Sequence, residues 1–204
     1  MIVIGVTGGS GSGKSRFCHY LSKACQAPVI DADQVYHAIT STPSACTAAL
    51  ADAFGEQVLQ QDGSLDRPQL ASLVFENSEK GRARLATLNS ITHKFVRLEF
   101  EEQLATYKQG GNTAVILDVP LLFESGFQDL CHYTVAILAS REVRLSRIML
   151  RDNLPREAAL RRLNAQPNDD FYIKQCNKTV YNNGEEITIK QEAERIAAKH
   201  MLLR

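Results

Sequence analysis

The sequence carries no excess of charge of either sign. Its 204 residues include 23 Lys and Arg and 23 Asp and Glu, so the formal net charge is zero. Proteins that bind nucleic acids usually present a broad positive field, and this chain also has no basic or acidic tail. We therefore expect no nucleic-acid partner, and any basic site has to be local.

Long hydrophobic runs are also missing. The longest apolar run, AVILDVPLLF at 114–123, is far shorter than the roughly 20 residues of a membrane-spanning helix, and Asp118 and Pro120 interrupt it. The N-terminus lacks the positively charged segment of a signal peptide, because glycines and polar residues begin at Gly5. We therefore expect a cytoplasmic protein without a membrane partner.

Cysteine is scarce and its spacing forms no known pattern. The five cysteines are odd in number, and no two of them make a C-x-x-C pair: Cys18, Cys25, Cys46, Cys131 and Cys176. This usage favours reduced thiols in a reducing compartment over a disulfide framework or a metal site.

Strand-like and helix-like segments alternate along the chain. Short β-branched runs predict strands, and apolar residues at helical spacing predict helices between them. This alternation predicts an α/β fold with a parallel sheet covered by helices on both faces. The expected strands are 1–8, 27–33, 113–123, 133–140 and 178–184. The main expected helices are 14–25, 80–108, 141–153, 156–166 and from 185 onward, and the all-helical segment 41–111 is long enough to form a subdomain.

A glycine-rich loop follows the first expected strand. The stretch GVTGGSGSGKS contains G-x-x-x-x-G-K-[ST] at Gly8, Gly13, Lys14 and Ser15, between a predicted strand and a predicted helix. Such a loop points successive backbone N–H groups at phosphate oxygens, and the following helix adds the positive end of its dipole. The lysine contributes a charge on the β- and γ-phosphates, and the serine hydroxyl can bind Mg²⁺. The loop therefore predicts nucleotide binding.

Two motifs of GTPases are missing. The only Asn-Lys pair lies in NKTV at 177–180, where Val180 replaces the base-recognising aspartate, and DVPL has Leu121 where a switch glycine would stand. Arginines instead recur on one helical face at Arg144, Arg147 and Arg151. This face could close over a triphosphate as a lid, or it could be a solvated basic face balanced by neighbouring acidic residues.

Carboxylates end two of the expected strands. Asp31 and Asp33 lie on one face if the second strand continues that far. Asp33 could accept a proton from an acceptor hydroxyl, or it could cap a helix beginning near Gln34. Asp118 could hold Mg²⁺ through water, or it could simply end its strand before Pro120.

Several further blocks occur in a fixed order. They are VIDADQVYH, GSLDRPQLASLVF, LNSITHKFVR, DVPLLFE, RLSRIMLRDN with RRLNAQ, and VYNNG. Together with the glycine loop they resemble the dephospho-CoA kinase family of P-loop kinases over nearly the whole chain. The resemblance implies a three-layer P-loop NTPase fold that transfers the γ-phosphoryl group of ATP to the ribose 3′-hydroxyl of dephospho-CoA. The products are CoA and ADP, in the last step of CoA biosynthesis.

The resemblance also implies roles for individual positions. Asp33 becomes the catalytic base, with Lys14 and Arg147 as the other catalytic residues. Residues expected to bind ATP are Gly9, Ser10, Gly11, Ser12, Gly13, Lys14, Ser15, Arg16, Arg147, Arg151 and Asn182, or Asn183 in place of the last. Residues expected to bind the acceptor are Asp33, Arg67, His93, Arg97, Leu121, Leu122 and Glu124. Mg²⁺ is assigned to Ser15 and, through water, to Asp118, and Arg162 and Gln166 match a block near the nucleotide base.

The resemblance further divides the chain into a core of about 1–40, 112–140 and 176–204, a helical substrate subdomain of about 41–111, and a lid of about 141–170. The protein is expected to act as a monomer on a small-molecule substrate. Three residues depart from the family pattern: Lys94 replaces a proline, and Asn177 and Tyr181 stand where aspartates are common. Two rival functions stay open, another small-molecule P-loop kinase acting on a nucleoside or nucleotide, and a nucleotide-binding regulatory protein that has lost catalysis.

Overall fold

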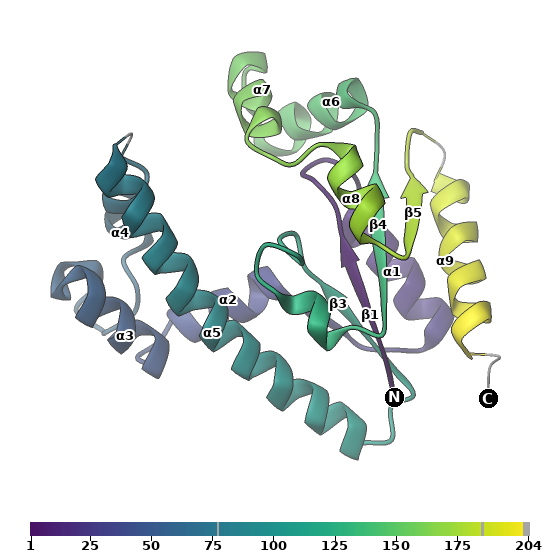
Figure 1. The fold of residues 1–204 in the computed structure, drawn as a ribbon, viewed down its shortest axis with the longest axis horizontal. Coiled ribbons are helices and arrows are strands. Elements are labelled where there is room, and N and C mark those ends of the chain that lie inside the picture. The colour runs from purple at the N-terminus through teal and green to yellow at the C-terminus, as the bar shows by residue number, and fades with distance from the viewer. Residues whose placement is uncertain (77, 185, 202–204) are drawn as a thin grey trace. The chain divides into compact units, whose positions relative to one another are not determined.

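The computed structural model describes residues 1–76, 78–184 and 186–201, and the chain divides into two compact units. Unit 1 comprises 1–31 and 106–204, and unit 2 comprises 32–105. Unit 2 therefore begins and ends earlier in the sequence than the helical subdomain expected at 41–111. Figure 1 labels the elements of both units.

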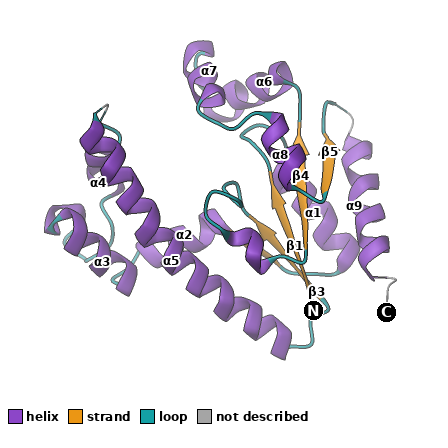
Figure 2. Cartoon of the chain, viewed as in Figure 1, coloured by secondary structure: helices purple, strands orange, loops and turns teal. Residues whose placement is uncertain are grey.

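A parallel five-stranded sheet forms the centre of unit 1. Its strands are β1 (Ile2–Thr7), β2 (Val29–Asp31), β3 (Ala114–Asp118), β4 (Tyr133–Leu138) and β5 (Lys178–Tyr181), in the order β2-β3-β1-β4-β5 (Figure 2). All four strand pairs are parallel. Because parallel strands end at the same edge of a sheet, the loops after β1, β3 and β4 start close together. The predicted parallel α/β fold is confirmed.

Helices pack on both faces of this sheet. Alternate residues of a strand point to opposite faces, and β4 shows this directly. Val135 and Ile137 belong to the core shared with α1 (Lys14–Cys25) and α9 (Glu186–Met201). Ala136 and Leu138 instead pack with Tyr172 of α8 (Asp169–Gln175). The central strands are therefore buried on both sides, as their continuous apolar sequence predicts.

Two helices follow β4 and form a small hairpin. They are α6 (Arg141–Asp152) and α7 (Arg156–Asn164), and the turn between them contains Asn153 in the left-handed conformation at φ 50°. Their facing apolar side chains make a separate buried cluster: Leu145, Ile148, Ala159 and Leu163. This cluster fixes the arginine-bearing face of α6 with respect to α7.

Unit 2 is helical. It contains α2 (Ala32–Thr40), α3 (Ala45–Phe54), the 3₁₀ helix η1 (Glu56–Val58), α4 (Arg67–Val74) and most of α5 (Glu79–Gln109). Its core is built from Cys46, Leu50, Val58, Leu65, Leu70 and Val74. Ser44 and Thr47 form a reciprocal capping box at the start of α3, and Asp66 caps α4. The unit thus has an apolar core of its own.

Several elements differ from the sequence-based expectations. The second strand ends at Asp31, and the third ends at Asp118, shortly before Pro120, which cannot donate a ladder hydrogen bond. Helix α8 was not expected. Its start is marked by Asn168, whose side chain accepts a hydrogen bond from the Phe171 N–H. The expected last helix began at residue 185, which lies outside the described residues.

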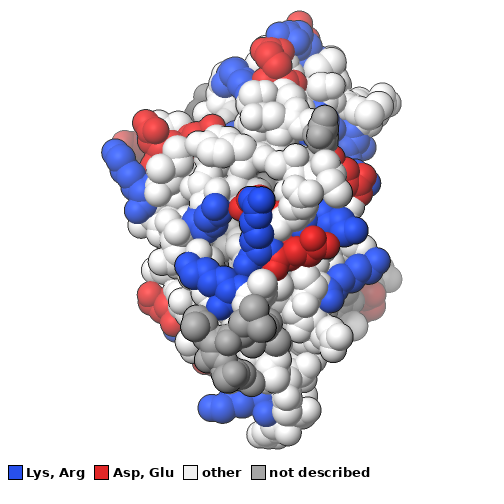
Figure 3. Space-filling model, turned by 90° about the vertical axis from the view of Figure 1, so that its right-hand side faces the viewer, with Lys and Arg blue, Asp and Glu red and all other residues white. Residues whose placement is uncertain are grey.

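The surface around α9 carries both signs of charge (Figure 3). Arg16 pairs with Glu186, and Glu192 pairs with both Lys178 and Arg195. Charges of opposite sign that are paired in this way cancel much of each other's field. Among the helices of the described ranges, none is both long and apolar enough to cross a membrane.

Candidate functional site

The glycine loop connects β1 to α1 at the carboxyl edge of the sheet. Gly13 is the N-cap residue of α1, and within the part of the chain that the structure describes no side chain caps this helix. The first N–H groups of a helix have no partner inside the helix, and the helix dipole makes this end positive. The arrangement is suited to binding an anion such as a phosphate group.

Side chains from later in the chain donate hydrogen bonds to the carbonyl groups of the loop. Arg144 Nε donates to the Ser10 carbonyl at 3.0 Å. Arg147 Nη1 donates to the carbonyls of Gly11 at 3.2 Å and Ser12 at 3.4 Å. Asn182, which is buried, donates from Nδ2 to the Ser12 carbonyl at 2.7 Å. Three consecutive carbonyls of the loop therefore each accept a hydrogen bond from a side chain of α6 or of the segment after β5.

Lys14 and Asp118 form an ion pair at the end of the sheet. Asp118 pairs in register with Val6 of β1 and with Asp31 of β2, and it is only 2% exposed. A carboxylate buried to this degree requires a charged or hydrogen-bonding partner, which Lys14 supplies. The pair holds the lysine beside the loop, and Ser15 follows it with an exposed side chain.

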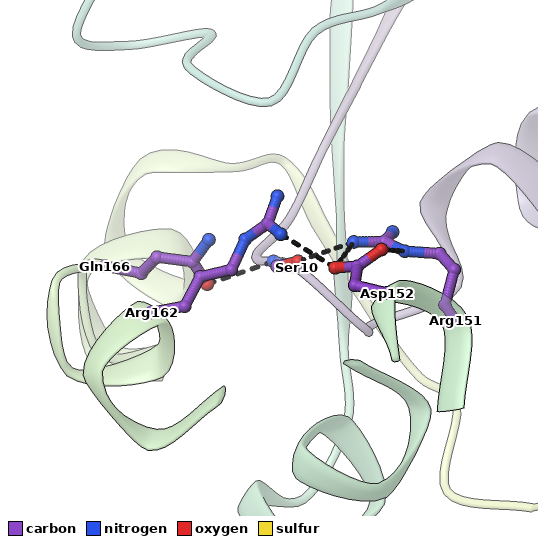
Figure 4. Close-up of polar contacts among 5 residues, drawn as sticks. All are labelled: Ser10, Arg151, Asp152, Arg162 and Gln166. Atoms are coloured by element: carbon purple, nitrogen blue, oxygen red, sulfur yellow. Dashed lines mark hydrogen bonds and ion pairs between the residues drawn. The ribbon is translucent and has the colours of Figure 1, made fainter. Parts of the chain in front are cut away.

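The end of α6 contacts the tip of the loop. Arg151 Nη2 donates to Ser10 Oγ at 3.2 Å and to Asp152 Oδ2 at 2.9 Å, and Arg162 Nη1 donates to the same carboxylate at 2.7 Å (Figure 4). The hydrogen bond from Arg151 holds the pKa of Asp152 below its ordinary value. Arg162 thus pairs with Asp152 in this structure. Gln166 accepts from the Ser10 N–H at 3.0 Å.

The segment after β3 presents the residues expected at the acceptor. Thr7 Oγ1 donates to the Pro120 carbonyl at 3.0 Å, which ties this segment to the end of β1. Leu121 is 48% exposed and Glu124 is also exposed, so both could contact a ligand. Leu122 is completely buried. Its side chain belongs to the core of unit 1, and its assignment to an acceptor pocket stays a prediction.

Asp33 lies in the first turn of α2, in unit 2, and is exposed. Since α2 begins at Ala32, Asp33 does not precede the helix, and the expected helix start near Gln34 is wrong. Asp31 ends β2, so the two carboxylates do not share the face of one strand. The sequence placed Asp31 correctly at the end of the second strand, but Asp33 belongs to the helix that begins directly after it.

Arg67 joins two helices of unit 2. Its Nη2 donates to the Thr40 hydroxyl at 2.7 Å and, at 3.3 Å, to both the His37 carbonyl and the Ser41 hydroxyl. Its guanidinium also lies 6.0 Å from the centre of the Tyr36 ring, within the range of a cation–π interaction. The start of α4 is thereby fixed to the end of α2, and the cation is held in one place.

His93 and Arg97 lie one turn apart on α5, also in unit 2. Burial lowers the pKa of His93, which favours the neutral form of its imidazole. Arg97 Nε donates to Glu101 Oε1 at 3.0 Å, four residues along the helix. Lys94, which replaces a proline of the family pattern, lies well inside α5, so no helix starts there.

The structure gathers Lys14, Asp118, Arg147, Arg151 and Asn182 around the loop in unit 1. It places Asp33, Arg67, His93 and Arg97 in unit 2. Arg144 and Gln166 also contact the loop, which the sequence did not predict. The arginine periodicity pointed to Arg144, but it did not distinguish a solvated side chain from one bound to a carbonyl.

Asn177 makes partly buried hydrogen bonds with Thr134, although it departs from the family pattern. Its Oδ1 accepts from the Thr134 N–H at 2.8 Å and from the Thr134 hydroxyl at 3.0 Å. An amide oxygen can accept these two hydrogen bonds as a carboxylate oxygen would. Tyr181, the other departure in this region, is 52% exposed at the end of β5.

Comparisons with known proteins agree on one family. The family model described as dephospho-CoA kinase matches residues 2–188. A dephospho-CoA kinase of Bacillus cereus is 36% identical over 97% of this chain and 96% of its own length, and one of Lactobacillus johnsonii is 34% identical over 89% of each chain.

Solved structures give the same result. A Thermus thermophilus protein superposes with a TM-score of 0.79 at 32% identity, covering 97% of both chains. Dephospho-CoA kinase from Campylobacter jejuni gives a TM-score of 0.60 at 25% identity, covering 97% of this chain and 96% of its own. A shikimate kinase of Acinetobacter baumannii, at 15% identity and a TM-score of 0.57, shares the fold. The chain belongs to the dephospho-CoA kinase family and is an ATP-dependent kinase with a P-loop NTPase fold.

Proposed function

We propose that this chain transfers the γ-phosphoryl group of ATP to the ribose 3′-hydroxyl of dephospho-CoA. The observation that carries the proposal is the complete phosphate loop with its paired Lys14, in a chain whose relatives are named dephospho-CoA kinases. In the reaction the 3′-oxygen forms a bond to the γ-phosphorus, and the bond from that phosphorus to the β–γ bridging oxygen breaks. ADP leaves, and the hydroxyl proton goes to a carboxylate.

ATP is proposed to bind in the loop. The N–H groups of Gly11 and of residues 13–16 would donate to phosphate oxygens, assisted by the dipole of α1. Those of Ser10 and Ser12 are bound to Gln166 and to the Gly9 carbonyl. Lys14 would place its charge on the β- and γ-phosphates, moving from Asp118 to a stronger anion. Arg151 lies close enough to the loop to reach the triphosphate by a side-chain movement. Asn182 would act from behind, by holding the Ser12 carbonyl.

Arg147 occupies the carbonyl side of the loop in this structure. Its positive charge stabilises the carbonyl dipoles of the loop, and in this arrangement Arg147 acts as a positioning residue. That Arg147 also contacts the transferring phosphoryl group stays a prediction.

Mg²⁺ is proposed to bind at the end of the loop. The donor set fits, because the Ser15 hydroxyl and the Asp118 carboxylate are oxygen ligands, which Mg²⁺ prefers alongside phosphate oxygens and water. Within the described ranges there is no cluster of three or more acidic, His or Cys side chains that could hold a metal alone. When bound, the ion would neutralise charge on the phosphate oxygens.

Residues of unit 2 are proposed to bind the acceptor. Asp33, an exposed residue in the first turn of α2, would accept the proton of the 3′-hydroxyl. Arg67 and Arg97 would supply positive charge for the anionic phosphates of dephospho-CoA, and His93 would supply a hydrogen bond. In unit 1, Leu121, Leu122 and Glu124 are proposed to contribute to acceptor binding.

We also propose that the enzyme acts as a cytoplasmic monomer on small molecules alone. All five cysteines are free thiols, and the net charge is zero, which supports a reducing compartment and gives no sign of a nucleic-acid partner.

The acceptor is tested by direct comparison. With Mg-ATP present, we expect ADP to form with dephospho-CoA at a kcat/KM at least about 100-fold above that with uridine or a nucleoside monophosphate, since specific polar contacts discriminate strongly. A coupled assay of ADP release measures all three acceptors. Faster turnover of a nucleoside or nucleotide would establish the rival kinase, and tight ATP binding without any transfer would establish the silent regulatory protein.

Lys14→Ala should lower kcat by about 100-fold or more, because a fixed charge next to the transferring phosphoryl group is lost. Lys23→Ala, an exposed lysine of the same helix, is the matched control and should keep normal kcat. Steady-state kinetics with ATP and dephospho-CoA provide the measurement. Turnover of Lys14→Ala within a few-fold of the wild type would refute the proposed role of this lysine.

Asp33→Asn should lower kcat by about 100-fold while KM for dephospho-CoA changes little, because the base acts in the transition state. Asp52→Asn changes an exposed aspartate of unit 2 and serves as the control. Kinetics and thermal melting should be measured on both variants. If Asp33→Asn mainly lowers the melting temperature and leaves kcat unchanged, Asp33 is a structural residue of α2.

A further inference from the structure

Two side chains bind the backbone of Ser10, at the tip of the phosphate loop, one at its carbonyl and the other at its N–H. Arg144 Nε donates to the Ser10 carbonyl at 3.0 Å, and the Ser10 N–H donates to Gln166 Oε1 at 3.0 Å. Arg144 Nη2 also donates to Gln166 Oε1 at 2.5 Å. The three residues therefore form a closed ring of hydrogen bonds, which we call the Ser10 clamp.

Arg144 lies very close to the glycines on either side of Ser10. A Cβ atom on Gly9 would collide with Arg144 Nη2 and lie 2.9 Å from Gln166 Oε1. A Cβ atom on Gly11 would lie 2.6 Å from the Arg144 carbonyl oxygen, and Gly11 has φ +78°. The phosphate-loop motif requires glycine at positions 8 and 13 but leaves 9 and 11 open. The close approach of Arg144 disfavours a side chain at both positions, and the positive φ of Gly11 adds to this there.

The Arg144 side chain is itself fixed. It is only 9% exposed, and its Nη1 lies 3.9 Å from Asp169 Oδ1. A guanidinium at this depth is stable only while its hydrogen bonds are made. The adjacent Leu145 and the nearby Ile148 belong to the buried cluster between α6 and α7, which fixes the backbone that carries it. The clamp is therefore part of the packed structure of unit 1.

We propose that Arg144 and Gln166 are positioning residues for nucleotide binding, which hold the loop at Ser10 so that its later N–H groups point at the phosphates. Neither side chain needs to touch the nucleotide. A glycine-rich loop loses much conformational freedom when it is ordered, and a loop ordered in advance leaves less of this cost to the binding step. The inference rests on the proposed ATP site, but not on the identity of the acceptor.

The test uses the full chain and ADP with Mg²⁺, without any acceptor. Gln166→Met and Arg144→Met remove the clamp with little change of volume. Gln175→Met and Arg161→Met are matched controls, since both side chains are exposed and lie in the same region of unit 1. Calorimetric titration gives Kd. We expect each clamp variant to bind ADP about tenfold more weakly than the wild type, and each control to bind it normally.

The double variant should bind ADP no more than about twofold more weakly than Arg144→Met alone, because both residues act through Ser10. In kinetics, KM for ATP should rise while KM for dephospho-CoA stays unchanged, a split that general loosening of the fold would not produce. Arg144→Lys should recover part of the affinity.

The proposal is overturned if folded Gln166→Met binds ADP within twofold of the wild type. It is also overturned if the two losses simply add in the double variant. Should Arg144→Met fail to fold, Gln166→Met decides alone. An enzyme that binds ADP as predicted but does not phosphorylate dephospho-CoA would contradict the proposed function and leave this inference standing.

Discussion

The direction of the peptide groups between β1 and α1 is the constraint on which the rest of the structure depends. A loop that turns its N–H groups inward toward a phosphate must turn its carbonyls outward, and buried carbonyls need donors. Arg144, Arg147 and Asn182 supply them for Ser10, Gly11 and Ser12. The helix after β4 and the turn after β5 are therefore required by the loop, although both lie more than a hundred residues away in the sequence.

The sheet order serves the same loop from its other side. Because β3 lies next to β1, its last residue, Asp118, reaches the first residue of α1 and pairs with Lys14. Because the carboxylate is buried, it needs the lysine as its partner. The pair in turn holds the lysine at the place where a phosphate would bind. One ion pair thus links the parallel topology to the proposed chemistry.

The sequence predicted what depends on local pattern. The phosphate loop and the parallel sheet follow from spacing and periodicity, and the structure confirms the fold. The sequence did not predict which side chains of PLLFE are buried, because a short apolar turn has no periodicity that would separate the exposed Leu121 from the buried Leu122. Nor did it predict the Ser10 clamp. The spacing of arginines on a helix face is the same whether water or a distant carbonyl accepts their hydrogen bonds.

The most direct test of the account is the fate of the γ-phosphoryl group, followed by ³¹P NMR while the enzyme turns over Mg-ATP and dephospho-CoA. We predict that the γ signal disappears as one new phosphomonoester signal appears in equal amount, and that this ester lies on the ribose 3′-oxygen. Inorganic phosphate as the only product, or a phosphoester at another position, would contradict it.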